Sequence, residues 1–430
     1  MSSDEKTTSS VWQCTTMTAG CAATADELIR ELFGTAASLA DPYPHYQRLR
    51  QVAPVHRSQL DGAVYLTRYD DCRQALLDPH CGRRPGRPAQ RVGMADSQVR
   101  LLARRRRQQH SMLMQNPPEH TRLRGFVSGV FTPQRIAALE GRIRQLVGEH
   151  VERLAEAGEA DIMEALAFPV PVIVIGELLG IPREEALQFR PLVEVIRRAE
   201  QPHAADDAVA AAERADQAID DYFARLVARR RERPGDDLLS ALVAIRDAGG
   251  SLSEDELTGT VMQLFVAGFV TTTNLIGNGL LALLRHPAEF ARLRADPKLI
   301  PSVVEELLRY DSPVQVNDRV VLAPTNIAGA SLEPGDNLTI IMGAANRDPA
   351  RFPDPDRLDV TRRGNQAALS FGWGIHHCLG AGLARLEGQI VFGQIAERFT
   401  DIQLLDDEPP RQPGFFLRGL QLLPVRLWSR

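Results

Sequence analysis

The chain has 430 residues, of which 44% are hydrophobic and 24% are charged, and its formal net charge is −5 at pH 7. This length allows one to three domains with a sizeable core, and the mixed, slightly acidic charge argues against a nucleic acid or an anionic membrane as partner. The cysteines are too scattered for a disulfide framework or a zinc site; they are Cys14, Cys21, Cys72, Cys81 and Cys378.

The N-terminal segment lacks the apolar core of a signal peptide. The longest apolar run, residues 165–176, is too short to span a membrane and is broken by Pro169 and Pro171. We therefore expect a cytoplasmic protein without membrane contact. Residues 1–35 are rich in Ser, Thr and Ala and are expected to form a flexible tail with one short helix, so that residues 36–430 form a single domain.

The predicted elements that follow the tail are short. They are a helix over 45–52, strands over 55–58 and 63–67 around an Asp61-Gly62 turn, and a helix over 69–77. Residues 82–109 are irregular and rich in Gly, Pro and Arg. A loop of this length can cover a binding site.

Beyond Pro133 the apolar residues recur at three- and four-residue steps, which indicates helices. The predicted helices are 136–157, 183–198, 205–231, 238–247, 253–285 and 300–311. The helix over 253–285 opens on a capping box, Ser253 and Glu256, and ends before Pro287. Beyond residue 401 the alternation indicates a β-hairpin, so the chain is predicted to be mainly α with a minor β region.

The middle of the long helix carries an unusual face. Ala267, Gly268 and Thr271 are three or four residues apart and are expected to share it. Two small residues would let a flat group approach the backbone, with a hydroxyl one turn later within reach. The alternative is helix packing, in which small residues allow a neighbouring helix to come close.

A single cysteine, Cys378, follows Gly372 and Gly374 and precedes apolar residues at helical spacing. A helix N-terminus favours an anion, so we expect a lowered thiol pKa, and the two glycines allow a tight turn. Gly380 leaves room for a flat group beside the helix. This arrangement suits one axial ligand of a haem iron, whereas the alternatives are a small buried residue or a metal site that includes His376.

The pattern F-G-x-G-x-H-x-C-x-G, from Phe371 to Gly380, is continued by L-A-R-x-E and resembles the haem-binding loop of the cytochrome P450 monooxygenases. Three further motifs of that family occur in its order: H-x-x-x-R, A-G-x-x-T and E-x-x-R. The resemblance extends from residue 41 to the end and is nearest to the soluble bacterial class. It implies the cytochrome P450 fold, a triangular, helix-rich single domain around a buried haem with small β-sheets.

The resemblance also implies a set of site residues. Cys378 would ligate the iron of haem b, and four polar side chains would contact its propionates. The complete set is His120, Arg124, Ala267, Gly268, Arg319, Phe371, Gly372, Gly374, His376, Cys378 and Gly380. Glu306, Arg309 and, further on, Arg357 would form a buried triad of charges. Substrate contacts are expected from the 82–109 loop, residues 191–205, Phe269, Val270 and residues 315–317.

The chain departs from the family pattern at one catalytic position. The pattern A-G-x-(Asp/Glu)-T supplies an acid and a threonine that relay protons to dioxygen, and Thr271 matches the threonine, but Val270 stands in the acid's place. Three hypotheses follow. A substrate group supplies the relay, ordered water reaches Thr271 by another route, or the reaction depends less on the usual oxygen activation.

The function implied by the resemblance is a haem-thiolate monooxygenase that inserts one oxygen atom from O2 into a small organic substrate. The substrate would be a polyketide, peptide or terpene of secondary metabolism, the electron donor a ferredoxin, and the enzyme a cytoplasmic monomer. Because of Val270, oxidative coupling, desaturation and peroxide-driven oxidation on the same scaffold stay open. A haem sensor without enzyme activity is a further alternative, against which Thr271 argues.

Overall fold

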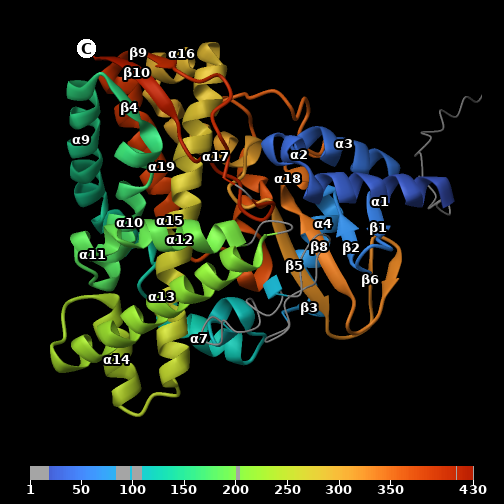
Figure 1. Cartoon of the computed structure of the whole chain (residues 1–430), viewed down its shortest axis with the longest axis horizontal. Helices are drawn as coiled ribbons and strands as arrows, with labels where there is room; N and C mark the ends of the chain where they lie inside the picture. The colour runs from blue at the N-terminus through green and yellow to red at the C-terminus, as the bar shows by residue number, and fades with distance from the viewer. Residues whose placement is uncertain (1–18, 84–96, 99–108, 200–203, 413, 430) are drawn as a thin grey trace, which may run out of the picture.

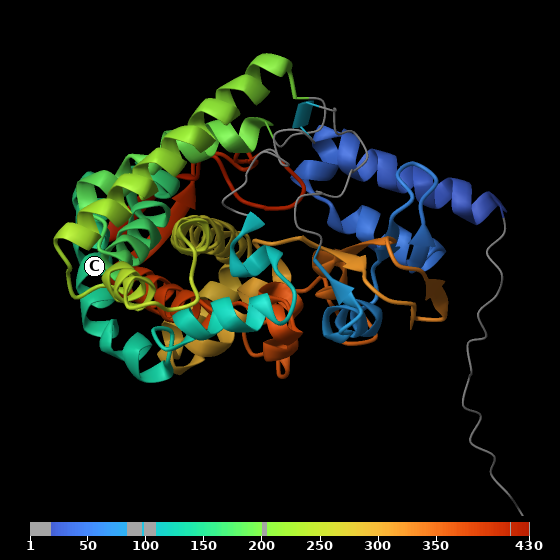
Figure 2. The ribbon, with the colours of Figure 1, turned by 90° about the horizontal axis from the view of Figure 1, so that it is seen from below.

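The computed structural model describes residues 19–83, 97–98, 109–199, 204–412 and 414–429. A large helical part lies beside a smaller part that combines strands with helices (Figure 1). Helix α15 (Glu254–Arg285) stands upright within the helical part in Figure 1, and Figure 2 looks almost along its axis. The predicted mainly α architecture with a minor β region is confirmed.

Helix α15 has 32 residues and forms the core of the helical part. The predicted capping box is present: the Ser253 hydroxyl accepts from the Glu256 N–H, and the Glu256 carboxylate accepts from the Ser253 N–H. The helix ends where Pro287 starts α16 (Pro287–Ala295). An apolar stretch of α15 is long enough to cross a membrane, but 78% of it is buried inside the protein, as in the core helix of a globular domain.

Further helices surround α15. They are α7 (Glu119–Ser128), α8 (Pro133–Ala138), α9 (Glu140–Ala157), α10 (Pro169–Leu179), α11 (Arg183–Leu187), α12 (Phe189–Ala199), α13 (Asp206–Glu232), α14 (Leu238–Asp247), α17 (Ile300–Tyr310) and α19 (Ala381–Arg398). The predicted helices 136–157 and 183–198 are each two helices. At Leu139 and Gln188 the N–H bonds to the carbonyl three residues back, which tightens the turn and ends the first helix.

A five-stranded sheet forms the core of the smaller part, in the order β1-β2-β8-β5-β3. Its strands are β1 (Val55–Arg57), β2 (Val64–Leu66), β3 (Cys81–Gly82), β5 (Val316–Val321) and β8 (Asn337–Ile341). The predicted hairpin of β1 and β2 is confirmed, as are the helices α3 (Tyr43–Val52) and α4 (Tyr69–Leu77). A small hairpin of β6 (Thr325–Ile327) and β7 (Ala330–Leu332) follows β5.

The prediction of a flexible tail over residues 1–35 is wrong from Ala19 onward. Helix α1 (Ala19–Gly34) buries Leu28, Leu32 and Phe33 in a core cluster that it shares with α3 and the sheet. The Phe33 ring lies 4.3 Å from the ring of Phe415 near the other end of the chain. Apolar residues at three- and four-residue steps carry this signal, which the Ser- and Thr-rich composition obscured. Residues 1–18 lie outside the described part.

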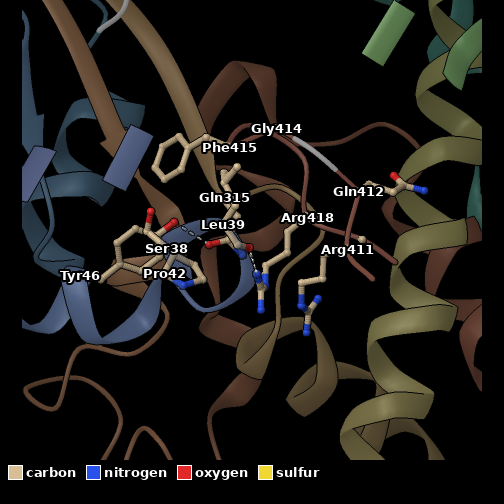
Figure 3. Close-up of a pocket in the computed structure, with 11 residues that line it drawn as sticks. Ser38, Leu39, Pro42, Tyr46, Gln315, Arg411, Gln412, Gly414, Phe415 and Arg418 are labelled. Atoms are coloured by element: carbon tan, nitrogen blue, oxygen red, sulfur yellow. Dashed lines mark hydrogen bonds between the residues drawn. The ribbon is translucent and has the colours of Figure 1, made fainter. Parts of the chain in front are cut away.

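The two ends of the chain meet at a buried ion pair. Arg418 pairs with Asp311 at 2.5 Å and donates to the carbonyls of Leu39 and Ala40, both at 2.9 Å, at the end of α2 (Ala36–Ala40). Figure 3 shows Arg418 beside Arg411, which also bonds to Asp311, at 3.2 Å. The C-terminal connection is thereby fixed against the N-terminal helices.

The predicted C-terminal hairpin is confirmed, although a long connection separates its strands. Strand β9 (Phe399–Leu404) pairs antiparallel with β10 (Pro424–Ser429), and β4 (Glu159–Asp161) extends the sheet on the other side of β10. The described residues of the connection, 405–412 and 414–423, include Gly419, where a Cβ would collide with Oδ1 of Asn274 in α15, and Leu420 and Leu423, which belong to the main core cluster.

The E-x-x-R pair is buried as predicted, but its partner is different. Glu306 and Arg309 of α17 are both 0% exposed and are joined at 2.8 Å. The third member is Arg362, whose Nε donates to Glu306 at 3.1 Å, and the choice of Arg357 was wrong. Arg357 has a side chain that is 66% exposed and pairs with Asp359, because the turns after residue 353 bring Arg362 back toward α17.

Candidate active site

Cys378 lies in a tight loop just before α19. Gly372 and Gly374 have φ angles of 66° and 71°, in the left-handed region that glycine adopts without strain. The Cys378 N–H donates to the Phe371 carbonyl at 2.9 Å. A Cβ at Gly374 would lie 2.6 Å from the Leu76 carbonyl oxygen, so only glycine permits this approach to α4. The loop therefore holds Cys378 in a fixed place.

The prediction of a lowered pKa for the Cys378 thiol is wrong for the protein without a bound metal ion. Cys378 is accessible to solvent, yet desolvation by the surrounding protein raises the pKa of its thiol, and the Gly380 N–H, Arg124 and Arg385 only partly offset this. A metal cation bound to the sulfur would itself deprotonate the thiol. A Cβ at Gly380 would meet no atom within 4 Å, which suits the close approach of a flat group there.

Five side chains, here called the cationic cluster, lie beside the cysteine loop. They are Arg83, His120, Arg124, Arg319 and His376. The rings of His120 and His376 are 4.3 Å apart, and Arg124 donates to the carbonyl of His377 at 2.9 Å. The structure thus brings together the four propionate-contacting residues that the sequence indicated, together with Arg83.

The cationic cluster has too few negative partners among the described residues. Both ring nitrogens of His120 and Nε2 of His376 are buried without a hydrogen-bond partner in that part of the chain. Burial, together with Arg83, Arg319 and other nearby cations, lowers the pKa of His376 to about 2. Burial lowers the pKa of Arg83 and Arg319, and Asp318 is the carboxylate that partly offsets this in both; one carboxylate does not balance the cluster.

Sequence reasoning missed Arg83, which strand pairing places in the cluster. Strand β3 pairs antiparallel with β5 with Gly82 opposite Val320, so the next position in this register sets Arg83 opposite Arg319. Burial lowers the pKa of Arg83 to about 10. Like charges opposite each other destabilise a sheet unless an anion lies between them. The two carboxylates of a haem fit this cluster, as Cys378 fits its iron.

The face of α15 that was predicted to receive a flat group is built from fewer residues than expected. Ala267 is exposed and Thr271 half-buried on one face, where the Thr271 hydroxyl donates to the Ala267 carbonyl at 3.0 Å. Gly268 does not share this face. Its Cβ would lie 2.8 Å from Cγ1 of Ile175 in α10, so Gly268 serves helix packing, which was the alternative interpretation.

The expected substrate contacts are only partly placed. Most of the 82–109 loop and residues 200–203 lie outside the described part. Phe269 and Val270 are 2% and 6% exposed. Gln315 is wrong as a substrate contact, because the Tyr46 hydroxyl donates to it at 2.9 Å and its amide donates to the Ser312 carbonyl at 2.7 Å; Figure 3 shows Gln315 in this buried network.

Comparisons with known proteins decide the family. Residues 89–424 match the family described as Cytochrome P450. The chain belongs to the cytochrome P450 family. Two of its relatives come from bacteria. The cytochrome P450 monooxygenase PikC of Streptomyces venezuelae is 39% identical over 402 residues. The polyketide biosynthesis cytochrome P450 PksS of Bacillus subtilis is 40% identical over 402 residues. These alignments cover 91% and 90% of the chain and 92% and 96% of the relatives.

A solved structure shows the same fold. The myxobacterial cytochrome P450 CYP267B1, solved in complex with myristic acid, superposes with a TM-score of 0.84 at 34% identity and covers 93% of this chain and 99% of its own. The predicted P450 fold is confirmed. The chain is therefore an enzyme of the P450 monooxygenase type, a family that carries haem and uses O2, and the alternative of a haem sensor without activity is wrong.

Proposed function

We propose that this P450 binds haem b with Cys378 as the iron ligand and inserts one oxygen atom of O2 into a small organic substrate by hydroxylation or epoxidation. One observation carries the proposal. The accessible thiol of Cys378 stands in a rigid loop beside a cationic cluster in which both ring nitrogens of His120 and Nε2 of His376 have no hydrogen-bond partner among the described residues. A haem, which brings one iron ion and two propionate carboxylates, would satisfy both features at once.

The cationic cluster would hold the two haem carboxylates. Arg83 and Arg319 offer planar donors from neighbouring strands, and charge-assisted bonds of this kind are among the strongest in proteins. His120 and His376 carry ring nitrogens that still need partners. Arg124 links the cluster to the cysteine loop, since it bonds to the His377 carbonyl and partly offsets the rise in the pKa of the Cys378 thiol.

The chemistry divides between cofactor and chain. When bound, a thiolate-ligated haem supplies the activation of dioxygen. The chain's part is to orient the sulfur, to position the substrate and to deliver protons. The Thr271 hydroxyl is suited to proton delivery. It donates to the Ala267 carbonyl, so its oxygen is free to accept a hydrogen bond from a second donor on that face of α15.

The substrate class is inferred from relatives. PikC is named a monooxygenase and PksS a polyketide biosynthesis enzyme, which supports a tailoring step on a polyketide or a similar secondary metabolite. We infer a ferredoxin as electron donor, a cytoplasmic location and a monomer. Oxidative coupling, desaturation or peroxide-driven oxidation is the second candidate, because Val270 places a buried aliphatic side chain where the family pattern has an acid.

Product analysis tests the proposal. The purified enzyme would be supplied with candidate polyketides, a ferredoxin with its reductase and NADPH, and in parallel with hydrogen peroxide alone. A product heavier by one oxygen atom, formed only with the electron donor, is the expected result. A product lighter by two hydrogen atoms would support coupling or desaturation instead, and turnover with peroxide alone would support the peroxide-driven alternative.

A further inference from the structure

A small cavity lies against α15 on the side that carries Val270. Its volume is about 40 Å³, which is room for roughly two or three water molecules. Helix α12, helix α15 and the C-terminal connection form most of its wall. The polar side chains that line it and matter here are Arg190, Glu194, Thr273, Asn274 and Gln412.

Several polar atoms in this wall lack partners. Thr273 is 7% exposed and Asn274 is 0% exposed, yet neither the Thr273 hydroxyl nor the Asn274 amide has a hydrogen-bond partner among the described residues, and the same holds for Oε1 of Gln412. Buried polar groups are almost always hydrogen-bonded. A polar cavity of this size is where ordered water supplies the missing partners.

An acid stands at the rim of this cavity. Glu194 of α12 lines it, while its side chain is 48% exposed to solvent. Arg190 fixes the carboxylate, because its Nε donates to Glu194 at 2.9 Å, and it also bonds to Glu164 at 3.2 Å. Glu194 therefore touches both bulk solvent and the cavity.

Asn274 is the cavity-lining side chain that stands next to both Val270 and Thr271 on α15. It stands four residues after Val270 and three after Thr271, and side chains at these separations are neighbours on a helix surface. The Asn274 amide can donate and accept at the same time. Since Asn274 lines the cavity, it can hold cavity water on the side of α15 next to Thr271.

We propose that Glu194 takes the place of the acid missing at position 270 and that protons pass from solvent through Glu194 and the cavity water, which Asn274 holds by hydrogen bonds, to Thr271. This inference rests on the proposed monooxygenase function. Each turnover takes one O2, two protons and two electrons, and gives one inserted oxygen atom and one water molecule. The external donor supplies the electrons, and Glu194 regains each proton from solvent and so ends unchanged.

A matched pair of variants tests the route. E194Q and E164Q each remove one carboxylate from Arg190, but only Glu194 lines the cavity. Because a positioned acid speeds proton transfer by roughly 100-fold or more, we expect E194Q to lower the product formed per electron by about tenfold and to raise the solvent isotope effect on turnover. E164Q should match the wild type.

Restoring the helix acid provides a rescue. V270E in the E194Q background should return the product formed per electron to near the wild-type value, because it places a carboxylate at the acid's position on α15. Equal effects of E194Q and E164Q, or failure of V270E to rescue, would overturn the route. A purely structural role of Glu194 predicts no rescue.

The hydration of the cavity has a test that does not depend on turnover. T273V keeps the side-chain shape and removes the hydroxyl, so a hydrated cavity predicts a lower Tm, whereas a dry one predicts a higher Tm because an unsatisfied group is lost. A higher Tm would overturn the proposal. If the wild type couples electrons to product and E194Q gives the same product per electron, the proton route alone is overturned. If the wild type holds no thiolate-bound haem, the proposed function is overturned as well.

Discussion

Arg83 is the residue that most changes the picture of the haem-binding site. It reaches the cationic cluster only because β3 pairs with β5. The Arg83 N–H donates to the Asn116 side-chain oxygen at 2.7 Å, and the Asn116 amide donates to the Arg83 carbonyl at 2.8 Å. The Arg83 guanidinium donates to the Asp318 carbonyl at 2.9 Å and lies close enough to Arg319 to lower the pKa of that residue, so an anion beside the two arginines would stabilise the pair.

We predict that R83M lowers the haem content of the purified protein. Loss of one of the charge-assisted contacts should weaken binding by about 2 kcal/mol, or roughly 30-fold. The ratio of haem to protein absorbance after dialysis measures this. R57M is the control, because Arg57 pairs with Asp336 at the exposed edge of the same sheet. Equal haem content in R83M and R57M would contradict the assignment.

Glu387 carries a buried carboxyl that no described residue satisfies at Oε2. Burial raises the pKa of Glu387 to about 8. The folded protein therefore holds a proton that the unfolded chain releases near pH 4.5, so the free energy of unfolding falls as pH rises from about 5 to 8, by up to about 1.4 kcal/mol per pH unit.

We predict that E387Q removes this part of the pH dependence. Glutamine stays neutral at every pH, so the variant should be more stable than the wild type at pH 8 and similar to it at pH 5. Chemical denaturation at both pH values measures the difference. A variant equally destabilised at both would mean that the carboxyl makes a specific contact that glutamine cannot replace.

At the scale of elements, the buried triad shows what local sequence can reveal. Glu306 and Arg309 are read directly from their three-residue spacing on α17. The third member is not, since Arg357 and Arg362 both stand in a turn-rich segment, and only the path of the backbone decides which reaches Glu306. Spacing within a helix is fixed by its geometry, whereas spacing across irregular turns is not.

We predict that R362A and R357A differ sharply. R362A leaves the buried Glu306 with one partner fewer and should lower the free energy of unfolding by about 3 kcal/mol, with a low yield of haem-bound protein. R357A removes an exposed pair and should cost less than about 1 kcal/mol. Urea denaturation of both variants measures this. The reverse order would restore Arg357 as the third member.

The helices and short strands could mostly be predicted from the sequence. The apolar periodicity of α13, α14 and α15 and the turn between β1 and β2 are local signals, and the structure agrees with them. At Leu139 and Gln188 one helix ends and the next begins, but the spacing of the apolar residues continues, so the pattern did not show these helix ends. In the same way, Gly268 could not be assigned to a face until α10 was in place.

At the scale of the whole molecule, contacts between distant segments had no local signal. Strand β2 pairs in parallel with β8 across more than half of the chain, and α1 packs on residues near the C-terminus. The cysteine loop and the histidines of the cationic cluster were predicted because their motifs are short and specific. Arg83 and the cavity beside Glu194 depend on how distant elements meet, and therefore only the structure reveals them.

The link between the chain ends gives a prediction at this scale. Burial alone would raise the pKa of Asp311, but Arg418 and Arg411 outweigh it and lower the pKa to about 2. The resulting stability is present above about pH 4 and is lost as pH falls to about 2. D311N should therefore lower the free energy of unfolding at pH 7 by about 3 kcal/mol, and the difference from the wild type should shrink toward pH 2. A difference that stays constant with pH, measured by urea denaturation, would contradict this.

The absorption spectrum of the reduced protein with carbon monoxide tests the central claim most directly, with C378S and C72S measured alongside. The account predicts the red-shifted band of thiolate-ligated haem in the wild type and in C72S, in which the buried cysteine of α4 is replaced, and its loss in C378S. A spectrum typical of histidine ligation in the wild type, or an unchanged band in C378S, would contradict the assignment of Cys378 as the iron ligand.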